Sequence, residues 1–306
     1  MFDDELATYH FGEEHPFGPK RYWAFKDEFE HRKLAKKVGL CSAQSATEKH
    51  LQLFHAQNYI QKVKQLSISG EAYLDCGDTP ARIGIYEAAC TVVGTTLKAI
   101  DLIMAKSCQH VFSPIAGLHH ATRTSAAGFC VFNDCGIAIE YLRNQYNIQR
   151  VAYIDIDAHH GDGVFYSFEE DVDLCFVDFH QDGATLYPGT GSIFETGKEK
   201  AAGSKLNIPL APYTTDDIAK ELWQRAEAFI EKSDPEFILL QCGADSLEGD
   251  PITQLNLSSE FHAYVATRLS RLAKKHCSDR LLALGGGGYN LDNIKTAWND
   301  VIEAMC

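Results

Sequence analysis

The chain has 306 residues, 45% of them hydrophobic and 23% charged, so its composition is that of a globular protein and excludes a disordered one. Its formal net charge of −14 argues against a nucleic-acid groove, which needs clustered Lys and Arg to neutralise phosphates. The acidic surface suits basic polypeptide segments, but it is weak information about the partner.

The first residues, MFDDELATYH, are acidic and polar, whereas a signal peptide is basic and then apolar. No apolar run approaches the length of about 18 residues that a membrane helix requires. Ten cysteines are scattered without a C-x-x-C pair, and several stand in apolar runs such as LCFVDF. This usage predicts buried free thiols in a reducing compartment, so we expect a cytoplasmic protein without membrane contact.

Apolar runs alternate with amphipathic stretches along the chain, which indicates a parallel sheet covered by helices on both faces. No linker, low-complexity tract or repeat divides the chain, so we predict one α/β domain over residues 1–306, with three α/β/α layers and a mainly parallel central sheet. In chain order, the predicted strands are HVFSPI (110–115), VAYIDID (151–157), LCFVDF (174–179), EFILLQC (236–242) and LLALG (281–285). The predicted helical faces are Ile85, Ala89, Val92, Val93, Thr96 and Ile100; Ile218, Leu222, Ala226, Phe229 and Ile230; and Phe261, Tyr264, Val265, Leu269 and Leu272.

Polar clusters follow four of the predicted strands. In parallel α/β folds ligands bind beyond the carboxyl ends of the strands, so these clusters are expected to meet at one edge of the sheet. The clusters are Gly117 to His120 after HVFSPI, DIDAHHGDG at the end of VAYID, Gly243-Ala-Asp245 after EFILLQC, and Gly285 to Tyr289 after LLALG.

The second cluster is typical of a metal site. Asp155, Asp157 and His159 alternate where a strand ends, so their side chains point to one face. Strand-end caps and turns are the structural alternative, which the further polar strand ends make less attractive. A mixed imidazole and carboxylate set with open positions suits catalytic Zn²⁺ or Fe²⁺. Gly161, two residues after His159, cannot supply a side-chain ligand, which favours one metal over two.

An ordered series of motifs resembles the histone deacetylase family, which includes acetoin-utilisation and acetylpolyamine-processing proteins. The likeness covers nearly the whole chain, from HPFGPKRY to the last helix, and is that of a bacterial-type single-domain member with the arginase/deacetylase fold. The motifs are His119-His120, Gly128-Phe129-Cys130 with Asn133-Asp134, DIDAHHGDG, Tyr187-Pro-Gly-Thr-Gly191, GAD and GGGGY.

The resemblance implies a zinc enzyme in which Asp157, His159 and Asp245 hold the metal. Iron(II) is a possible substitute. A hydroxide-like nucleophile would be available near neutral pH, since zinc lowers the pKa of bound water to about 7.

The same resemblance implies the catalytic residues. His119 and His120 would flank the attacking water, with His120 as the proton shuttle. Asp155 would orient His119 and Asp162 would orient His120. Tyr289 would donate a hydrogen bond to the oxyanion that develops in the transition state.

Further positions match the family's substrate tunnel. Phe129 and Tyr187 would form its aromatic walls, with core packing as the structural alternative. Gly128 would offer a backbone carbonyl to the substrate amide, and Asp78 would grip the substrate backbone at the rim. Ile252 would stand at the entrance, where polyamine-specialised relatives carry an acid.

Two further features concern small ligands. Arg21 resembles the arginine near an internal acetate exit. A potassium ion near the zinc would be held by Asp155, by Asp178 and by Phe179 through backbone carbonyl oxygen. Asp178 stands where relatives have a hydroxyl residue, and this second carboxylate is expected to make the ion site more negative.

The sequence therefore predicts a zinc-dependent hydrolase that removes acyl groups from lysine side chains of peptides or proteins. The neutral Ile252 favours that substrate over acylated small amines such as acetylpolyamines, the first alternative. A catalytically inactive module that binds acylated partners is the second alternative, which the complete set of catalytic residues disfavours.

Overall fold

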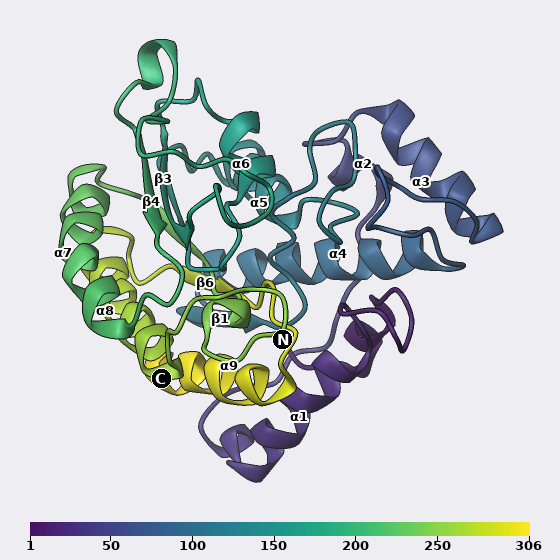
Figure 1. The fold of residues 1–306 in the computed structure, drawn as a ribbon, viewed down its shortest axis with the longest axis horizontal. Helices are drawn as coiled ribbons and strands as arrows, with labels where there is room; N and C mark the ends of the chain where they lie inside the picture. Colours follow the sequence, from purple (N-terminus) through teal and green to yellow (C-terminus); the bar gives the residue numbers. More distant parts are fainter.

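A computed structural model describes all 306 residues, and six strands form one parallel sheet in the order β1-β6-β5-β2-β3-β4. Since all strands run in the same direction, their carboxyl ends lie along one edge of the sheet (Figure 1). The strands are β1 (His110–Ser113), β2 (Val151–Asp155), β3 (Leu174–Gln181), β4 (Lys205–Leu210), β5 (Phe237–Gln241) and β6 (Leu281–Leu284).

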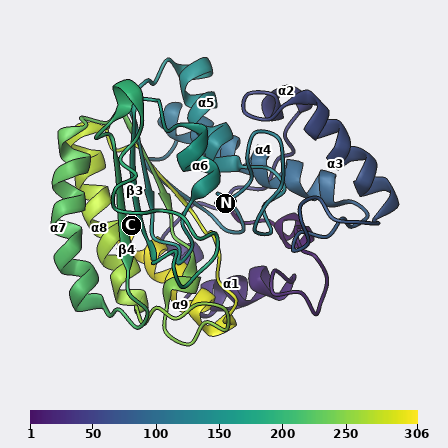
Figure 2. The same cartoon turned by 45° about the horizontal axis from the view of Figure 1, so that its top comes forward.

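Helices cover both faces of the sheet, as predicted for near-continuous apolar strands. Figure 2 shows α7 and α8 on one face and α4, α5 and α6 on the other, which gives the α/β/α layers. The helices are α1 (Lys20–His31), α2 (Glu48–Leu51), α3 (Gln57–Ser69), α4 (Ile85–Met104), α5 (Asp134–Tyr146), α6 (Asp162–Ser167), α7 (Asp216–Lys232), α8 (Ser259–His276) and α9 (Leu291–Met305). Short 3-10 helices are η1 (Asp4–Thr8), η2 (Leu34–Lys36), η3 (Glu199–Ala201) and η4 (Ala244–Ser246).

All five predicted strands are present, with ends that differ by one or two residues. The sixth strand, β4, was not predicted because its sequence KLNIPL mixes Lys205, Asn207 and Pro209 with apolar residues. It lies at the edge of the sheet next to β3, where proline is tolerated because one side of the strand needs no partner. The buried ammonium of Lys205 donates to the carbonyl oxygens of Asp171 (2.7 Å) and Leu174 (2.9 Å).

The three predicted helical stretches are confirmed, and two of the predicted faces are buried while the third is buried only in part. The face predicted for α4 is fully buried, and that of α8 is buried except for the partly exposed Tyr264. In α7 the predicted Ala226 and Ile230 are buried, but the predicted Ile218 is 50% exposed, because the buried stripe runs through Trp223 instead. That stripe is Ala219, Trp223, Ala226 and Ile230.

All ten cysteines are free thiols, and six of them are buried, in agreement with the predicted thiol usage. Among the helices, none combines the length and the apolar character needed to cross a membrane.

Candidate active site

The order of the strands brings the polar clusters together. β2 lies beside β5, and their register places Asp155 next to Gln241, so the residues that follow these strands meet. β6 and β1 continue the sheet beyond β5, which brings the loop before Tyr289 and the loop with the two histidines to the same edge.

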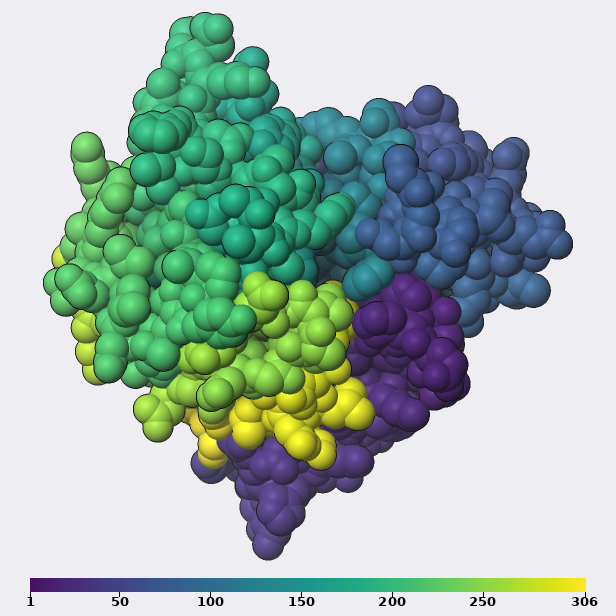
Figure 3. All heavy atoms as spheres, viewed as in Figure 1, coloured from purple at the N-terminus to yellow at the C-terminus, as the bar shows by residue number.

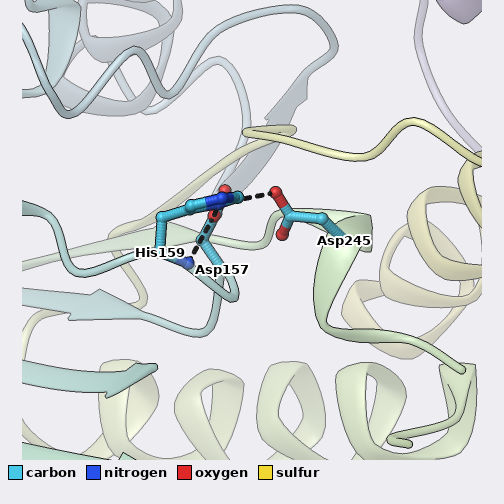
Figure 4. A group of neighbouring side chains, drawn as sticks. All are labelled: Asp157, His159 and Asp245. Carbon is cyan, nitrogen blue, oxygen red and sulfur yellow. Dashed lines mark hydrogen bonds and ion pairs between the residues drawn. The ribbon is translucent and has the colours of Figure 1, made fainter. Parts of the chain in front are cut away.

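Asp157, His159 and Asp245 form a buried cluster whose possible ligand atoms lie within 4.8 Å of one another. His159 Nδ1 is 3.1 Å from Asp157 Oδ1 and 3.2 Å from Asp245 Oδ2 (Figure 4). The other carboxylate oxygens are held by protein donors, since Asp157 Oδ2 accepts from Gly287 N (2.8 Å) and Asp245 Oδ1 from Ala158 N (2.9 Å). One oxygen of each carboxylate therefore remains with the imidazole, which is a donor set that fits Zn²⁺ or Fe²⁺.

The charges within this cluster are strongly coupled. Burial opposes the protonation of His159, but its hydrogen bonds to both carboxylates raise its pKa to about 10. Burial also opposes the ionisation of Asp157, yet the nearby His119 and His159 hold the pKa of Asp157 well below its usual range. A cation bound here would take the place of the imidazole proton, because only neutral imidazole ligates a metal.

The glycines of GGGGY allow close approach to the cluster. A Cβ atom on Gly287 would lie 2.0 Å from Asp245 Oδ2, and a Cβ on Gly243 would lie 2.0 Å from Asp157 Oδ2. A side chain at either position would therefore occupy the space of the cluster itself.

Two histidine–aspartate dyads lie side by side next to the cluster. His119 Nδ1 is 2.7 Å from Asp155 Oδ2, and His120 Nδ1 is 2.7 Å from Asp162 Oδ1. The two Nε2 atoms are 3.1 Å apart, so one of these nitrogens must donate and the other accept. All four residues were predicted from the sequence to interact in these pairs.

The two histidines have opposite proton affinities. Burial would lower the pKa of His119, but the charges of Asp155 and Asp157 raise it to about 10. Burial and the charge of His119 lower the pKa of His120 to about 4. Near neutral pH His119 is therefore the protonated ring, and His120 is the neutral ring.

Aromatic rings surround these polar groups. The ring of Tyr187 lies 5.2 Å from that of His120, and the ring of Phe129 lies 5.8 Å from that of Tyr289. A small cavity is lined by both histidines, Gly128 and Tyr289, and also by Asp157 and His159 of the cluster. Gly128 lies so close to His120 that a Cβ would meet the imidazole at 2.3 Å. Burial raises the pKa of the Tyr289 phenol well above its usual value, so this hydroxyl remains a donor.

The predicted rim residues lie in two loops. Asp78 is exposed in a tight turn, and its carboxylate accepts a hydrogen bond from Thr79 Oγ1 at 3.0 Å. Ile252 is 37% exposed, and its N–H donates to Asp250 Oδ1 at 3.0 Å. The other oxygen of Asp250 accepts from Tyr289 N at 2.8 Å, so Ile252 lies beside the loop that carries Tyr289.

Arg21 is buried beneath the glycine loop. Its guanidinium donates to the carbonyl oxygens of Gly288 (2.7 Å) and Gly286 (2.6 Å) and lies 3.8 Å above the ring of Phe17. Burial lowers its pKa from the usual value. The acetate-exit role of Arg21 stays a prediction.

Asp178 is buried next to Asp155 in the β2–β3 register, and the potassium site that these residues would form stays a prediction. Its Oδ1 lies 2.7 Å from His180 Nδ1, and His180 Nε2 lies 2.9 Å from the carbonyl oxygen of Gly191. Because both ring nitrogens face acceptors, His180 is a doubly protonated counter-ion to Asp178. The added negative charge expected from Asp178 is thus balanced within the chain, while Phe179 directs its side chain onto Trp223 (ring centroids 5.8 Å apart).

The sequence did not reveal several supporting residues, among them Gln241, Asp250, His180 and Thr79. Gln241 donates to Asp157 Oδ2 at 2.8 Å and is the one polar residue of β5, FILLQ, a signal that could have identified it. His180 stands two residues after Asp178 on a strand and therefore shares its face.

The parallel sheet order, with histidine and carboxylate groups at its carboxyl edge, defines an α/β/α protein with the histone deacetylase fold. The family model "Histone deacetylase domain" matches residues 15–305, and the chain belongs to this family of deacetylases.

The relatives and solved structures agree with this assignment. The chain is 36% identical over 299 residues to the acetoin utilization protein AcuC of Bacillus subtilis, covering 95% of this chain and 77% of that protein. It is 32% identical over 314 residues to AcuC of Staphylococcus aureus (strain MRSA252), covering 100% and 80%. The crystal structure of the HDA15 HD domain has the same fold, with a TM-score of 0.90 and 24% identity over 99% of this chain and 88% of that one.

Proposed function

We propose that the protein hydrolyses the amide bond of N-acyl-lysine in peptides or proteins, with zinc held by Asp157, His159 and Asp245. The observation that carries this proposal is the juxtaposition of the buried Asp–His–Asp cluster with two histidine–aspartate dyads and the Tyr289 loop. Bound zinc would polarise the acyl carbonyl and lower the pKa of its water, and Fe²⁺ could serve in its place.

The protein's own residues would move the protons. His120, neutral near pH 7, would accept a proton from the water as its oxygen bonds to the acyl carbon. It would then give this proton to the amine nitrogen as the carbon–nitrogen bond breaks, releasing lysine and a carboxylic acid. Asp162 would keep the ring oriented through the 2.7 Å hydrogen bond to Nδ1.

The remaining residues would hold the substrate. Phe129 and Tyr187 would enclose the aliphatic part of the acyl-lysine, and the Gly128 carbonyl would accept from its amide. Asp78 would accept hydrogen bonds from the peptide backbone, and Arg21 would receive the departing acetate. Asp155, Asp178 and the backbone carbonyl of Phe179 would hold the family's potassium ion, with His180 balancing the second carboxylate. Ten free thiols suit a reducing compartment, which supports a cytoplasmic location.

One experiment tests the proposal against its nearest rival. A series of acyl-lysine peptides and a series of acetylpolyamines are compared as substrates of the same zinc-loaded enzyme. Higher kcat/KM for a peptide supports the proposal, and higher kcat/KM for an acetylpolyamine supports a small-molecule amidohydrolase instead. Peptide binding without any turnover would identify an inactive recognition module.

Ile252→Glu is expected to shift preference from acetyl-lysine peptides towards acetylpolyamines. A carboxylate there would attract a distant ammonium, and it would stay unpaired beside a neutral peptide, at about 1–3 kcal/mol if fully buried. Because Ile252 is 37% exposed, we take the lower end of this energy range, about 1 kcal/mol. This energy changes the ratio of kcat/KM for the acetylpolyamine to kcat/KM for the peptide roughly five-fold.

The measurement is kcat/KM for one peptide and one acetylpolyamine at low and moderate salt, since added salt screens the attraction. Ile252→Gln is the matched control, because the Gln side chain has nearly the same size as that of Glu but carries no charge. A ratio that does not move in the Glu variant would show that Ile252 does not face the substrate.

A further inference from the structure

The backbone of Phe129, a predicted tunnel wall, has a conformation that non-glycine residues seldom adopt. Its φ is +66°, and such a conformation persists only where the surroundings hold it. Two side chains from distant segments do so. Thr79 Oγ1 accepts from the N–H of Phe129 at 3.0 Å, and the hydroxyl of Tyr9 donates to its carbonyl oxygen at 2.7 Å.

Both of these side chains are buried, and both make a second hydrogen bond. Tyr9 is 1% exposed, and its hydroxyl oxygen also accepts from Val131 N at 3.0 Å. Thr79 is fully buried, and its hydroxyl proton is donated to Asp78 Oδ1 at 3.0 Å. A continuous path therefore runs from the Phe129 N–H through the Thr79 hydroxyl to the carboxylate at the rim.

The N-terminal segment reinforces this connection. The ring of His15 packs edge-on against that of Phe129, with centroids 4.7 Å apart. His15 Nδ1 accepts from Phe17 N at 3.0 Å, so its proton is on Nε2, which lies 3.3 Å from the backbone carbonyl oxygen of Asp78. In Figure 3 the purple N-terminal segment borders the blue segment that contains the Asp78 turn.

We propose that Tyr9 and Thr79 are positioning residues for the tunnel, and that Thr79 couples the aromatic wall to substrate recognition at Asp78. A hydroxyl has a single proton to give, so the rotamer that serves Asp78 also fixes the oxygen that receives the Phe129 N–H. The backbone amides of a bound peptide would fix the carboxylate of Asp78. Through the hydrogen bond from Thr79, the fixed carboxylate would then hold Phe129 in place.

This inference rests on the proposed function. The path through Thr79 would make the enzyme selective for acyl-lysine that is part of a peptide. A free acylated amine has no backbone amides for Asp78, so it gains nothing from the path through Thr79. Tyr9 acts on the wall alone and should serve both classes of substrate equally.

The central test compares Thr79→Val, which removes the hydroxyl, with Thr79→Ser, which keeps it. For an acetyl-lysine peptide, Thr79→Val is expected to lower kcat/KM about 10-fold, mainly through KM. For an acetylated diamine of similar length the loss should be at most about 3-fold. Thr79→Ser should recover most of the loss, and Thr79→Val should add little in an Asp78→Asn background.

Tyr9→Phe provides the contrasting variant, with about the same several-fold loss expected for both substrates. Tyr146→Phe removes a hydroxyl that donates to Asp101 Oδ1 at 2.7 Å at the C-terminal end of α5, and it controls for the loss of a phenol in general. Melting temperatures and zinc content of all variants separate altered recognition from altered folding. If Thr79→Val lowers kcat/KM equally for the peptide and the diamine, the coupling is overturned. A change in kcat/KM for the peptide of less than two-fold would also overturn it.

Peptide affinity measured by fluorescence anisotropy separates failure of the coupling from failure of the proposed activity. If the wild type binds the peptide without hydrolysing it, the proposed catalysis is wrong while the coupling still predicts weaker binding by Thr79→Val than by Thr79→Ser. Equal affinities of these two variants would overturn the coupling alone. No binding by the wild type would overturn both.

Discussion

Replacing Asp245 with alanine is expected to remove most of the bound zinc and nearly all activity together. Asp245 would supply one of only three protein ligands, and its Oδ2 lies 3.2 Å from His159 Nδ1 in the cluster. Loss of a residue that merely orients a ligand typically weakens metal binding about 10- to 100-fold, so loss of a ligand should cost more. The measurement is zinc content by atomic spectroscopy after dialysis, together with deacetylase turnover.

Two further variants distinguish a lost ligand from a damaged fold. Asp245→Ala also leaves the buried N–H of Ala158 without its acceptor, which lowers the free energy of unfolding by about 1–3 kcal/mol. Asp245→Asn can keep an oxygen on that N–H, which turns the amide nitrogen towards the cluster and should still impair zinc binding. Asp250→Asn alters a nearby buried carboxylate and should retain the metal. Full zinc occupancy in both Asp245 variants would disprove the ligand assignment.

Most of the sheet could be predicted because burial on both faces selects runs of apolar residues. VAYID and FILLQ are entirely buried and are apolar except at their last residue, so their sequences alone indicate central strands. β4 could not be predicted in this way, since an edge strand has fewer neighbours and admits Lys205 and Pro209. The exposure of Ile218 in α7 has a related cause. The buried stripe of this helix runs through Trp223, whose ring stacks on that of Phe179 in β3, and packing between elements decides which stripe is buried.

In the candidate site, too, some residues could be predicted from the sequence and others depend on contacts between distant segments. Residues such as Asp157 and Asp245 could be found because they follow strands directly, and parallel strands bring their ends together. Tyr9 and Thr79 could not, because their roles depend on contacts with Phe129 across separations of 120 and 50 residues. His180 is an intermediate case. Strand alternation places it on the face of Asp178, but only the structure shows that its second nitrogen also faces an acceptor, which makes it a charged partner.

Tyr289→Phe is expected to lower kcat by about 100-fold or more, while KM stays within a few-fold. A donor that acts only on the developing oxyanion stabilises the transition state and not the bound substrate, and removal of one such donor typically costs 10²–10³ in kcat. The structure supports this role through preorganisation. Asp250 Oδ2 holds the N–H of Tyr289 at 2.8 Å, and the ring of Phe129 packs against its ring at 5.8 Å.

The pH dependence gives this prediction a second, independent readout. Burial raises the pKa of Tyr289 well above its usual value of about 10, so the wild-type phenol keeps its proton, and kcat should not fall through its ionisation below pH 10. The Phe variant should show the same pH profile at a uniformly lower level, because the proton on His120 and not that on Tyr289 is transferred. Tyr146→Phe, which removes a hydroxyl at the C-terminal end of α5, controls for general effects of losing a phenol. An unchanged kcat in Tyr289→Phe would mean that other groups stabilise the oxyanion. A change in the shape of the pH profile would instead place Tyr289 in the proton transfer itself.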